Sequence, residues 1–111
     1  MKTYPVIIAM AVFFAANAKA APFSWINGKV TRLYVQQPNF TVAVVNNTGV
    51  RFCDSSTGVN YAVTSDNLFY DLLKTALETK RNVEVGINNF GLDPQAGTPK
   101  LCINRVILNG P

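Results

Sequence analysis

The sequence contains no histidine, two cysteines and one tryptophan, and charged residues make up 14% of it. Without histidine, neither a Ser-His-Asp nor a Cys-His catalytic group can be built, and the Cys/His patterns typical of zinc and haem attachment are missing. Carboxylates remain, such as the pairs Asp66 with Asp71 and Asp54 with Asp93, which in principle suit sugar hydrolysis. Carboxylates at helix caps and in turns are usually structural. We therefore expect a protein that is not an enzyme and has no cofactor and no metal site.

Positive charge is also scarce. The full chain has ten Lys and Arg against six Asp and Glu, and two of the ten, Lys2 and Lys19, fall within the first twenty residues. No run of like charges occurs that would form a patch for a polyanion. Tyr34, Phe40 and Tyr61 could stack on nucleic-acid bases, but in a domain of this size such residues are more often core. We expect no nucleic-acid partner.

Long hydrophobic runs are absent except for a short one at the N-terminus. Eleven apolar residues, 6–16, follow Lys2 and precede Ala18-Lys19-Ala20, a small-x-small cleavage pattern. A membrane-spanning helix needs about 20 apolar residues, so we interpret residues 1–20 as a secretory signal peptide and expect no membrane span after cleavage. Residues 21–111 then form one domain that is secreted or periplasmic.

The two cysteines, Cys53 and Cys102, indicate a disulfide bond in an exported chain, because oxidising compartments preserve such bonds. Their spacing does not match a Cys-x-x-Cys redox or metal motif. We expect a structural bridge between them. Closing a loop of about 50 residues would stabilise the fold by roughly 4 kcal/mol in the chain-entropy model.

Hydrophobic patterning predicts strands in the first half of the domain. We expect strands at residues 29–36, 40–45 and 50–53, extended structure at 59–63, and turns at Asn27-Gly28 and at 46–49. The apolar residues of 29–36 do not alternate cleanly, which predicts a β-bulge near Thr31 and Arg32. Both faces of 40–45 are apolar. We expect Ala43 and Val45 on the outer face, where a partner or a second subunit would cover them.

The hydrophobic period then changes to that of a helix. Apolar residues at i, i+3 and i+4 predict a helix over residues 66–80, with Ser65 as its N-cap. Beyond it, 83–87 alternates as a strand, 89–100 has the composition of a long loop, and 101–108 predicts a last strand with an irregularity. Five strands with one helix between the third and fourth predict a mainly β domain, a five-stranded, partly open barrel like the OB-fold. The third and fifth strands are neighbours in that fold, which suits a Cys53–Cys102 bond.

This layout resembles the binding subunits of subtilase cytotoxin and of pertussis-like toxins, small secreted OB-fold proteins that assemble as rings of five. The resemblance rests on five segments: Phe23-Ser24, the strand near 30–35, Pro38-Asn39-Phe40, the Cys53 region, and the helix at 68–79 followed by Val83-Glu84-Val85. It implies a secreted binding subunit that recognises glycans, in a homo-oligomeric ring beside a catalytic toxin subunit.

Two positions depart from that pattern. The toxin subunits pair the third-strand cysteine with one in the second strand, and residues 40–45 contain none. They usually have Thr-Gly after the helix, where this chain has Thr79-Lys80.

Glycan binding calls for an exposed aromatic face beside hydrogen-bonding side chains. Trp25, flanked by Ser24 and Asn27, is the main candidate, and Tyr34 is the next. Trp25 could instead plug one end of the barrel. The alternative function is a monomeric periplasmic or secreted module that binds or inhibits another protein through an unknown ligand site.

Overall fold

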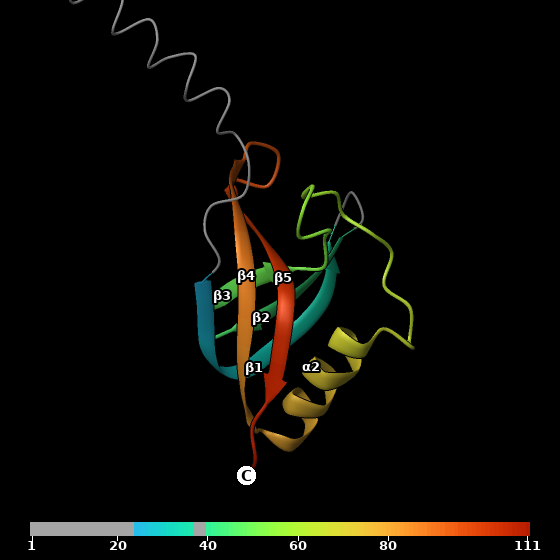
Figure 1. The fold of residues 1–111 in the computed structure, drawn as a ribbon, viewed down its shortest axis with the longest axis vertical. Helices are drawn as coiled ribbons and strands as arrows, with labels where there is room; N and C mark the ends of the chain where they lie inside the picture. The colour runs from blue at the N-terminus through green and yellow to red at the C-terminus, as the bar shows by residue number, and fades with distance from the viewer. Residues whose placement is uncertain (1–23, 37–39) are drawn as a thin grey trace, which may run out of the picture.

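The structure is a computed structural model that describes residues 24–36 and 40–111. Its described elements are β1 (Ser24–Gln36), β2 (Phe40–Val45), β3 (Thr48–Arg51), α2 (Leu68–Thr79), β4 (Asn82–Asp93) and β5 (Thr98–Leu108) (Figure 1). The expected signal peptide, Phe23 and Pro38-Asn39 lie outside the described residues. Among the residues it does describe, no helix is long and apolar enough to cross a membrane.

The five strands close into a ring in the order β1-β2-β3-β5-β4, and α2 stands between β3 and β5 in the chain. All neighbours are antiparallel except β3 and β5, which run parallel and are paired at Arg51 and Cys102. So short a pairing leaves the ring partly open. The predicted five-stranded, OB-fold-like barrel with a helix between its third and fourth strands is therefore confirmed.

β1 is longer than predicted and strongly curved (Figure 1). The turn predicted at Asn27-Gly28 is wrong, because Ser24 to Lys29 pair with Ile87 to Asn82 of β4. Gly28 instead allows a close approach, since a Cβ there would lie 2.8 Å from Asn46 Cβ. The predicted bulge is confirmed by the register shift between Val30 and Arg32. It separates the half of β1 that pairs with β4 from the half that pairs with β2.

β2 has the predicted bounds, and a two-residue turn joins it to β3. Asn46 and Asn47 have φ values of 49° and 61°, as a type I′ turn requires. The prediction of a turn over 46–49 and a third strand at 50–53 is displaced by two residues, because Thr48 and Gly49 already pair with β2. The segment expected to be extended, 59–63, pairs with the chain after β3 through one bridge, between Cys53 and Asn60.

α2 is shorter than the predicted helix at 66–80, and its N-cap is Asn67 instead of Ser65. The Asn67 side-chain oxygen accepts a hydrogen bond of 3.0 Å from the Tyr70 N–H, which caps the first turn. At the other end Lys80 adopts the left-handed conformation, with φ 58°, and its N–H donates to the Ala76 carbonyl.

β4 and β5 form a long hairpin, and the loop predicted over 89–100 is wrong. Pairing continues from Asn89 with Leu101 to Asp93 with Thr98, across a register shift that accommodates the intervening residues. A turn at 94–97 is left at the tip. The predicted irregularity in the last strand is confirmed opposite Gly86 and Ile87.

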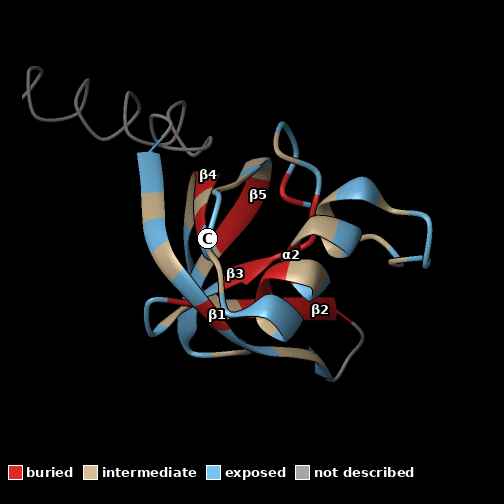
Figure 2. Cartoon of the chain, turned by 90° about the horizontal axis from the view of Figure 1, so that it is seen from below, coloured by how far each residue is buried: buried red, intermediate tan, exposed pale blue. Residues whose placement is uncertain are grey.

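The hydrophobic core fills the barrel beneath α2 (Figure 2). Its fully buried side chains include Phe52, Leu73, Val83, Val85 and Ile103, contributed by the sheet, the chain after β3 and the helix. Ala43 and Val45 are both 0% exposed within this core. The prediction that they form the outer face of the second strand is therefore wrong, and the outer face carries Phe40, Val42 and Val44.

The disulfide between Cys53 and Cys102 is confirmed, with a Cα–Cα distance of 5.1 Å and a sequence separation of 49 residues. Both cysteines are buried. The bond fixes the chain after β3 to β5 next to Arg51 and Cys102, where the two strands pair. It therefore reinforces the short seam that closes the ring.

Candidate functional site

A groove of about 600 Å³ lies on the outer face of the barrel. Its floor and one wall come from the second half of β1, from β2 and from β3, and the tip of the β4–β5 hairpin forms the opposite wall. Two cross-strand rows run from the β1 wall across the floor: Arg32–Val44–Gly49 and Tyr34–Val42–Arg51. After the bulge in β1, Arg32, Tyr34 and Gln36 lie on the outer face of the barrel. The long β4–β5 hairpin extends beside that face, and the groove lies between the two.

The floor of the groove is apolar. Phe40 is 5% exposed and Val42 is 4% exposed, although both point away from the barrel core. Gly49 leaves one end of the floor open, and a Cβ there would meet Val42 Cγ1 at 3.4 Å, an ordinary packing distance. Phe40 and Val42 close the bottom of the groove, and the half-buried Val44 is the more accessible apolar residue on its floor. A larger side chain at Gly49 would fill part of the groove.

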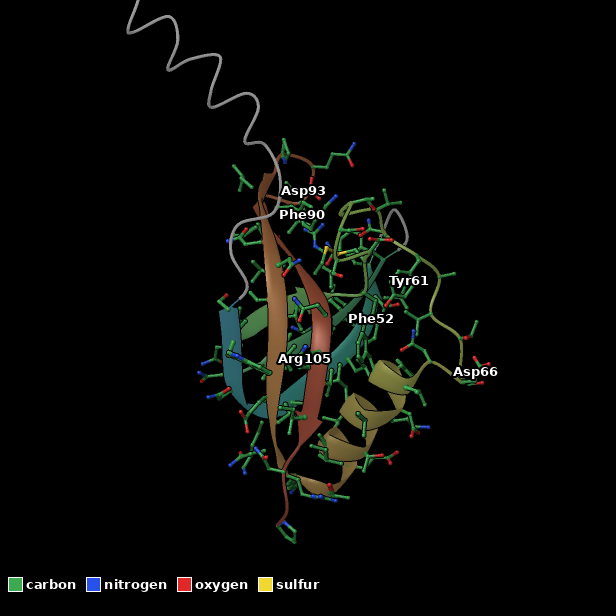
Figure 3. All side chains as sticks on the ribbon, viewed as in Figure 1. Phe52, Tyr61, Asp66, Phe90, Asp93 and Arg105 are labelled. Carbon is green, nitrogen blue, oxygen red and sulfur yellow. A yellow bond between two sulfur atoms is a disulfide. The ribbon has the colours of Figure 1, made fainter. Side chains whose placement is uncertain are left out.

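Arg51 joins this floor to the hairpin wall. Its guanidinium lies 4.3 Å from the centre of the Phe40 ring, donates to Asp93 Oδ2 at 2.7 Å and donates to Thr98 Oγ1 at 3.2 Å. Arg51 is 3% exposed and the Asp93 side chain 16% exposed, and Asp93 lies at the end of β4 (Figure 3). The contact is a largely buried ion pair, and it uses both guanidinium NH2 groups inside the protein.

The same contact controls the charge of Asp93. The hydrogen bond from Arg51 lowers the pKa of the Asp93 carboxyl below its usual value, and a hydrogen bond from the Gln95 N–H to Oδ1 adds to this effect. Asp93 therefore stays ionised into the acid range, and the ion pair holds the hairpin tip against β3.

Arg32 and Tyr34 form the more accessible wall. The Arg32 guanidinium lies 4.8 Å from the centre of the Tyr34 ring, a cation–π distance. Arg32 is exposed and forms no ion pair with a described acidic residue, so its hydrogen-bonding groups face solvent. Gln36, Asn47 and Thr48 add amide and hydroxyl groups around the groove. The groove thus combines an apolar floor, a stacked cation and aromatic ring, and a polar rim.

The structure separates the four residues predicted to bind a ligand. Ser24, Trp25 and Asn27 lie in the first half of β1, beside Ile87, Gly86 and Glu84 of β4. Tyr34 lies nine residues beyond Trp25, past the bulge, at about 3.3 Å per residue of strand. Only Tyr34 among the four lines the groove.

Trp25 is 40% exposed and outside the core cluster, so it does not plug the barrel.

Sequence reasoning missed Arg32, Phe40 and Arg51 as groove residues. Alternation after the bulge could have placed Arg32 and Gln36 beside Tyr34, because residues two apart share a face of a strand. The pairing of Arg51 with Asp93 spans 42 residues and depends on a hairpin that was interpreted as a loop. Among residues 24–36 and 40–111, no group of three or more His, Cys, Asp or Glu side chains is placed to hold a metal ion.

Comparison of the chain with protein-family models, with curated proteins and with solved structures found no match.

Proposed function

We propose that this protein is a secreted, non-catalytic binding module that holds a glycan in the groove over β2 and β3. The observation that carries the proposal is the Arg32–Tyr34 stack beside an apolar floor of Phe40 and Val42. In OB-folds, oligosaccharides bind on the face of the second and third strands and against the loop between the fourth and fifth strands. The groove occupies that position, with the 94–97 turn as its far wall.

The groove offers what a sugar ring needs on both of its sides. The carbon face of a sugar packs on an aromatic or aliphatic surface, which Tyr34 and the half-buried Val44 supply. The sugar hydroxyls bond to planar amides and guanidinium groups, which Gln36, Asn47 and Arg32 supply. A volume of about 600 Å³ lies within the range of small-molecule sites.

Export is part of the proposal. The disulfide between Cys53 and Cys102 is of the kind that persists in oxidising compartments, and the expected cleavage after Ala20 is consistent with a secreted or periplasmic location. N-terminal sequencing of the exported protein tests the cleavage, with Ala21 expected as the first residue.

A ring of five subunits and a catalytic partner are supported by the resemblance to toxin binding subunits alone. The apolar face of β2 that suggested a subunit contact, Ala43 and Val45, is internal. Light scattering of the oxidised protein distinguishes a ring of five subunits from a monomer. A mass near five subunits supports the ring, and a monomer supports the alternative, a periplasmic or secreted protein-interaction module.

The experiment for the groove is a glycan microarray probed with the oxidised protein and with Gly49→Leu. The Cβ of a leucine at this position would meet Val42 Cγ1 of the groove floor at 3.4 Å and no backbone atom outside its chain neighbours. Gly110→Leu is the matched control, since a Cβ there would meet no atom within 4 Å. We expect Gly49→Leu to lose the array signal at least tenfold and Gly110→Leu to retain it. Equal binding by all three proteins would contradict the proposal.

A further inference from the structure

The second half of β1 has a strand partner on one edge and none on the other. Residues Ser24 to Lys29 pair with β4 along one edge, and residues Val30 to Gln36 pair with β2 along the opposite edge. Beyond the bulge, the edge that faced β4 is therefore left without a strand. Such an edge presents a row of backbone N–H and C=O groups to any chain that can pair with it.

The pairing of β2 with β1 and β3 shows which backbone N–H and C=O groups of β1 point away from β2. Across the two-residue turn, Val45 and Thr48 form a hydrogen-bonded pair, and the pattern repeats every second residue. The Phe52 N–H, which donates to the Thr41 carbonyl at 3.1 Å, confirms this phase. Phe40, Val42 and Val44 consequently direct their backbone groups towards β1.

On β1, the partners of these residues are Gln36, Tyr34 and Arg32. Leu33 and Val35 therefore point their N–H and C=O groups away from β2. Within the described part of the chain, no residue donates to or accepts from these four groups.

A pocket of about 220 Å³ lies beside this edge. Leu33, Val35 and Val63 supply its apolar lining, and Thr41, Ser65 and Tyr70 supply hydroxyls. Thr41 is 7% exposed, and its hydroxyl bonds to no other described residue. Val35 is 68% exposed although apolar. The pocket is too small for a whole ligand and suits one side chain.

One carboxylate lies at the rim of the pocket, because the hydroxyl of the lining residue Thr64 donates to Asp66 Oδ1. In the sequence Asp66 follows the lining residue Ser65, Asp71 follows Tyr70, and Lys74 lies one helical turn beyond Tyr70. Asp66 lies at the outer end of the segment before α2 (Figure 3). A hydrogen bond from the Thr64 hydroxyl lowers the pKa of Asp66, so this carboxylate keeps its charge. Positive charge on an incoming chain would be attracted here.

We propose that the unpaired edge of β1 at Leu33 and Val35 binds an extended segment of a partner protein as an added β-strand. The segment places one apolar side chain in the pocket and carries a basic residue next to it, facing Asp66. Main-chain hydrogen bonds to Leu33 and Val35 supply affinity, and the pocket and the acidic rim supply specificity. This surface lies at the edge of the strand whose outer face forms the groove, and it does not depend on glycan binding.

The test is a titration of the oxidised, ¹⁵N-labelled protein with a synthetic pentapeptide of alternating lysine and valine, followed by amide chemical shifts and amide exchange. We expect the Leu33 and Val35 amides to shift and to exchange at least tenfold more slowly when the peptide is bound. A matched peptide with glutamate in place of lysine should bind at least fivefold more weakly. No change at these two amides at millimolar peptide would overturn the proposal.

A pair of variants tests whether the Val35 N–H bonds to the added strand. Val35→Pro removes an N–H that β2 does not use, and edge strands tolerate proline at such a position. Val35→Thr keeps the N–H and the branched shape and serves as the control. Binding should be lost in the first variant and kept in the second. Equal binding by both would overturn the proposal, as would shifts of Leu33 and Val35 that depend on protein concentration without peptide, because a second copy would then occupy the edge.

Discussion

Arg51 Nη1 donates a hydrogen bond of 2.7 Å to Asp93 Oδ2, across 42 residues of sequence. This contact links β3 to the end of β4, while the Cys53–Cys102 bond links the chain after β3 to β5. Together they stabilise the region where β3 and β5 share one described residue pair. The ion pair also positions the hairpin tip as a wall of the groove.

The ion pair predicts an acid-dependent loss of stability. Arg51 lowers the pKa of Asp93 in the folded protein. The stability that the ion pair contributes is therefore fully present above the unfolded-state pKa of about 4, and it is lost as the pH falls through the folded-state pKa. Asp93→Asn should lower Tm by a few degrees at pH 7. Thermal unfolding followed by circular dichroism from pH 7 to pH 2 measures this. The difference between the two proteins should shrink in acid, and a constant difference would contradict the assignment.

The disulfide should contribute a large share of the stability. The double variant Cys53→Ala with Cys102→Ala should lower the free energy of unfolding by about 4 kcal/mol, because a loop of this length is no longer closed in the unfolded chain. Urea unfolding measures the effect. In the presence of a strong reductant the two proteins should unfold at nearly the same urea concentration, and a persistent gap would indicate lost packing instead.

One substitution at the C-terminal end of α2 should raise the free energy of unfolding. Lys80 adopts φ 58°, a conformation that glycine tolerates best, so Lys80→Gly should raise the free energy of unfolding by roughly 0.5–1 kcal/mol. The control is Thr79→Gly, one residue earlier and inside the helix, which should lower it by a similar amount. Urea unfolding of both variants checks the opposite signs, and equal signs would reject the cap assignment.

The approach of β1 to the β2–β3 turn predicts that a larger residue at Gly28 destabilises the fold. An alanine Cβ at residue 28 would lie 2.8 Å from Asn46 Cβ, and the backbone there has φ 151°, so Gly28→Ala should cost about 1–3 kcal/mol through overpacking and backbone strain. Gly49→Ala is the matched control, since its Cβ meets Val42 Cγ1 at an ordinary 3.4 Å. Urea unfolding should show a much smaller change for the control, and equal losses would contradict the packing described for Gly28.

The sequence predicts local features of this fold well and long-range pairing poorly. The bounds of β2 and the bulge in β1 follow from local patterning, and both are confirmed. The hairpin extension beyond Asn89 could not be predicted, because Gly91 and Pro99 are typical of loops, whereas here Gly91 lies in the bulge between Asn89 and Leu92 and Pro99 pairs with Leu92. The candidate groove could not be predicted for the same reason, because it also depends on long-range pairing. Which face of β2 is internal depends on register with β1 and β3, and the Arg51–Asp93 contact depends on the extended hairpin.

The most direct measurement compares Tyr34→Ala with Trp25→Ala on one glycan microarray, using oxidised proteins that unfold at the same temperature as the wild type. The two aromatic residues lie on one strand, but Tyr34 lines the groove and Trp25 lies beside β4. We predict that Tyr34→Ala loses at least tenfold in apparent affinity and that Trp25→Ala binds as the wild type does. Loss in Trp25→Ala with full binding by Tyr34→Ala would place the ligand outside the groove and contradict this account.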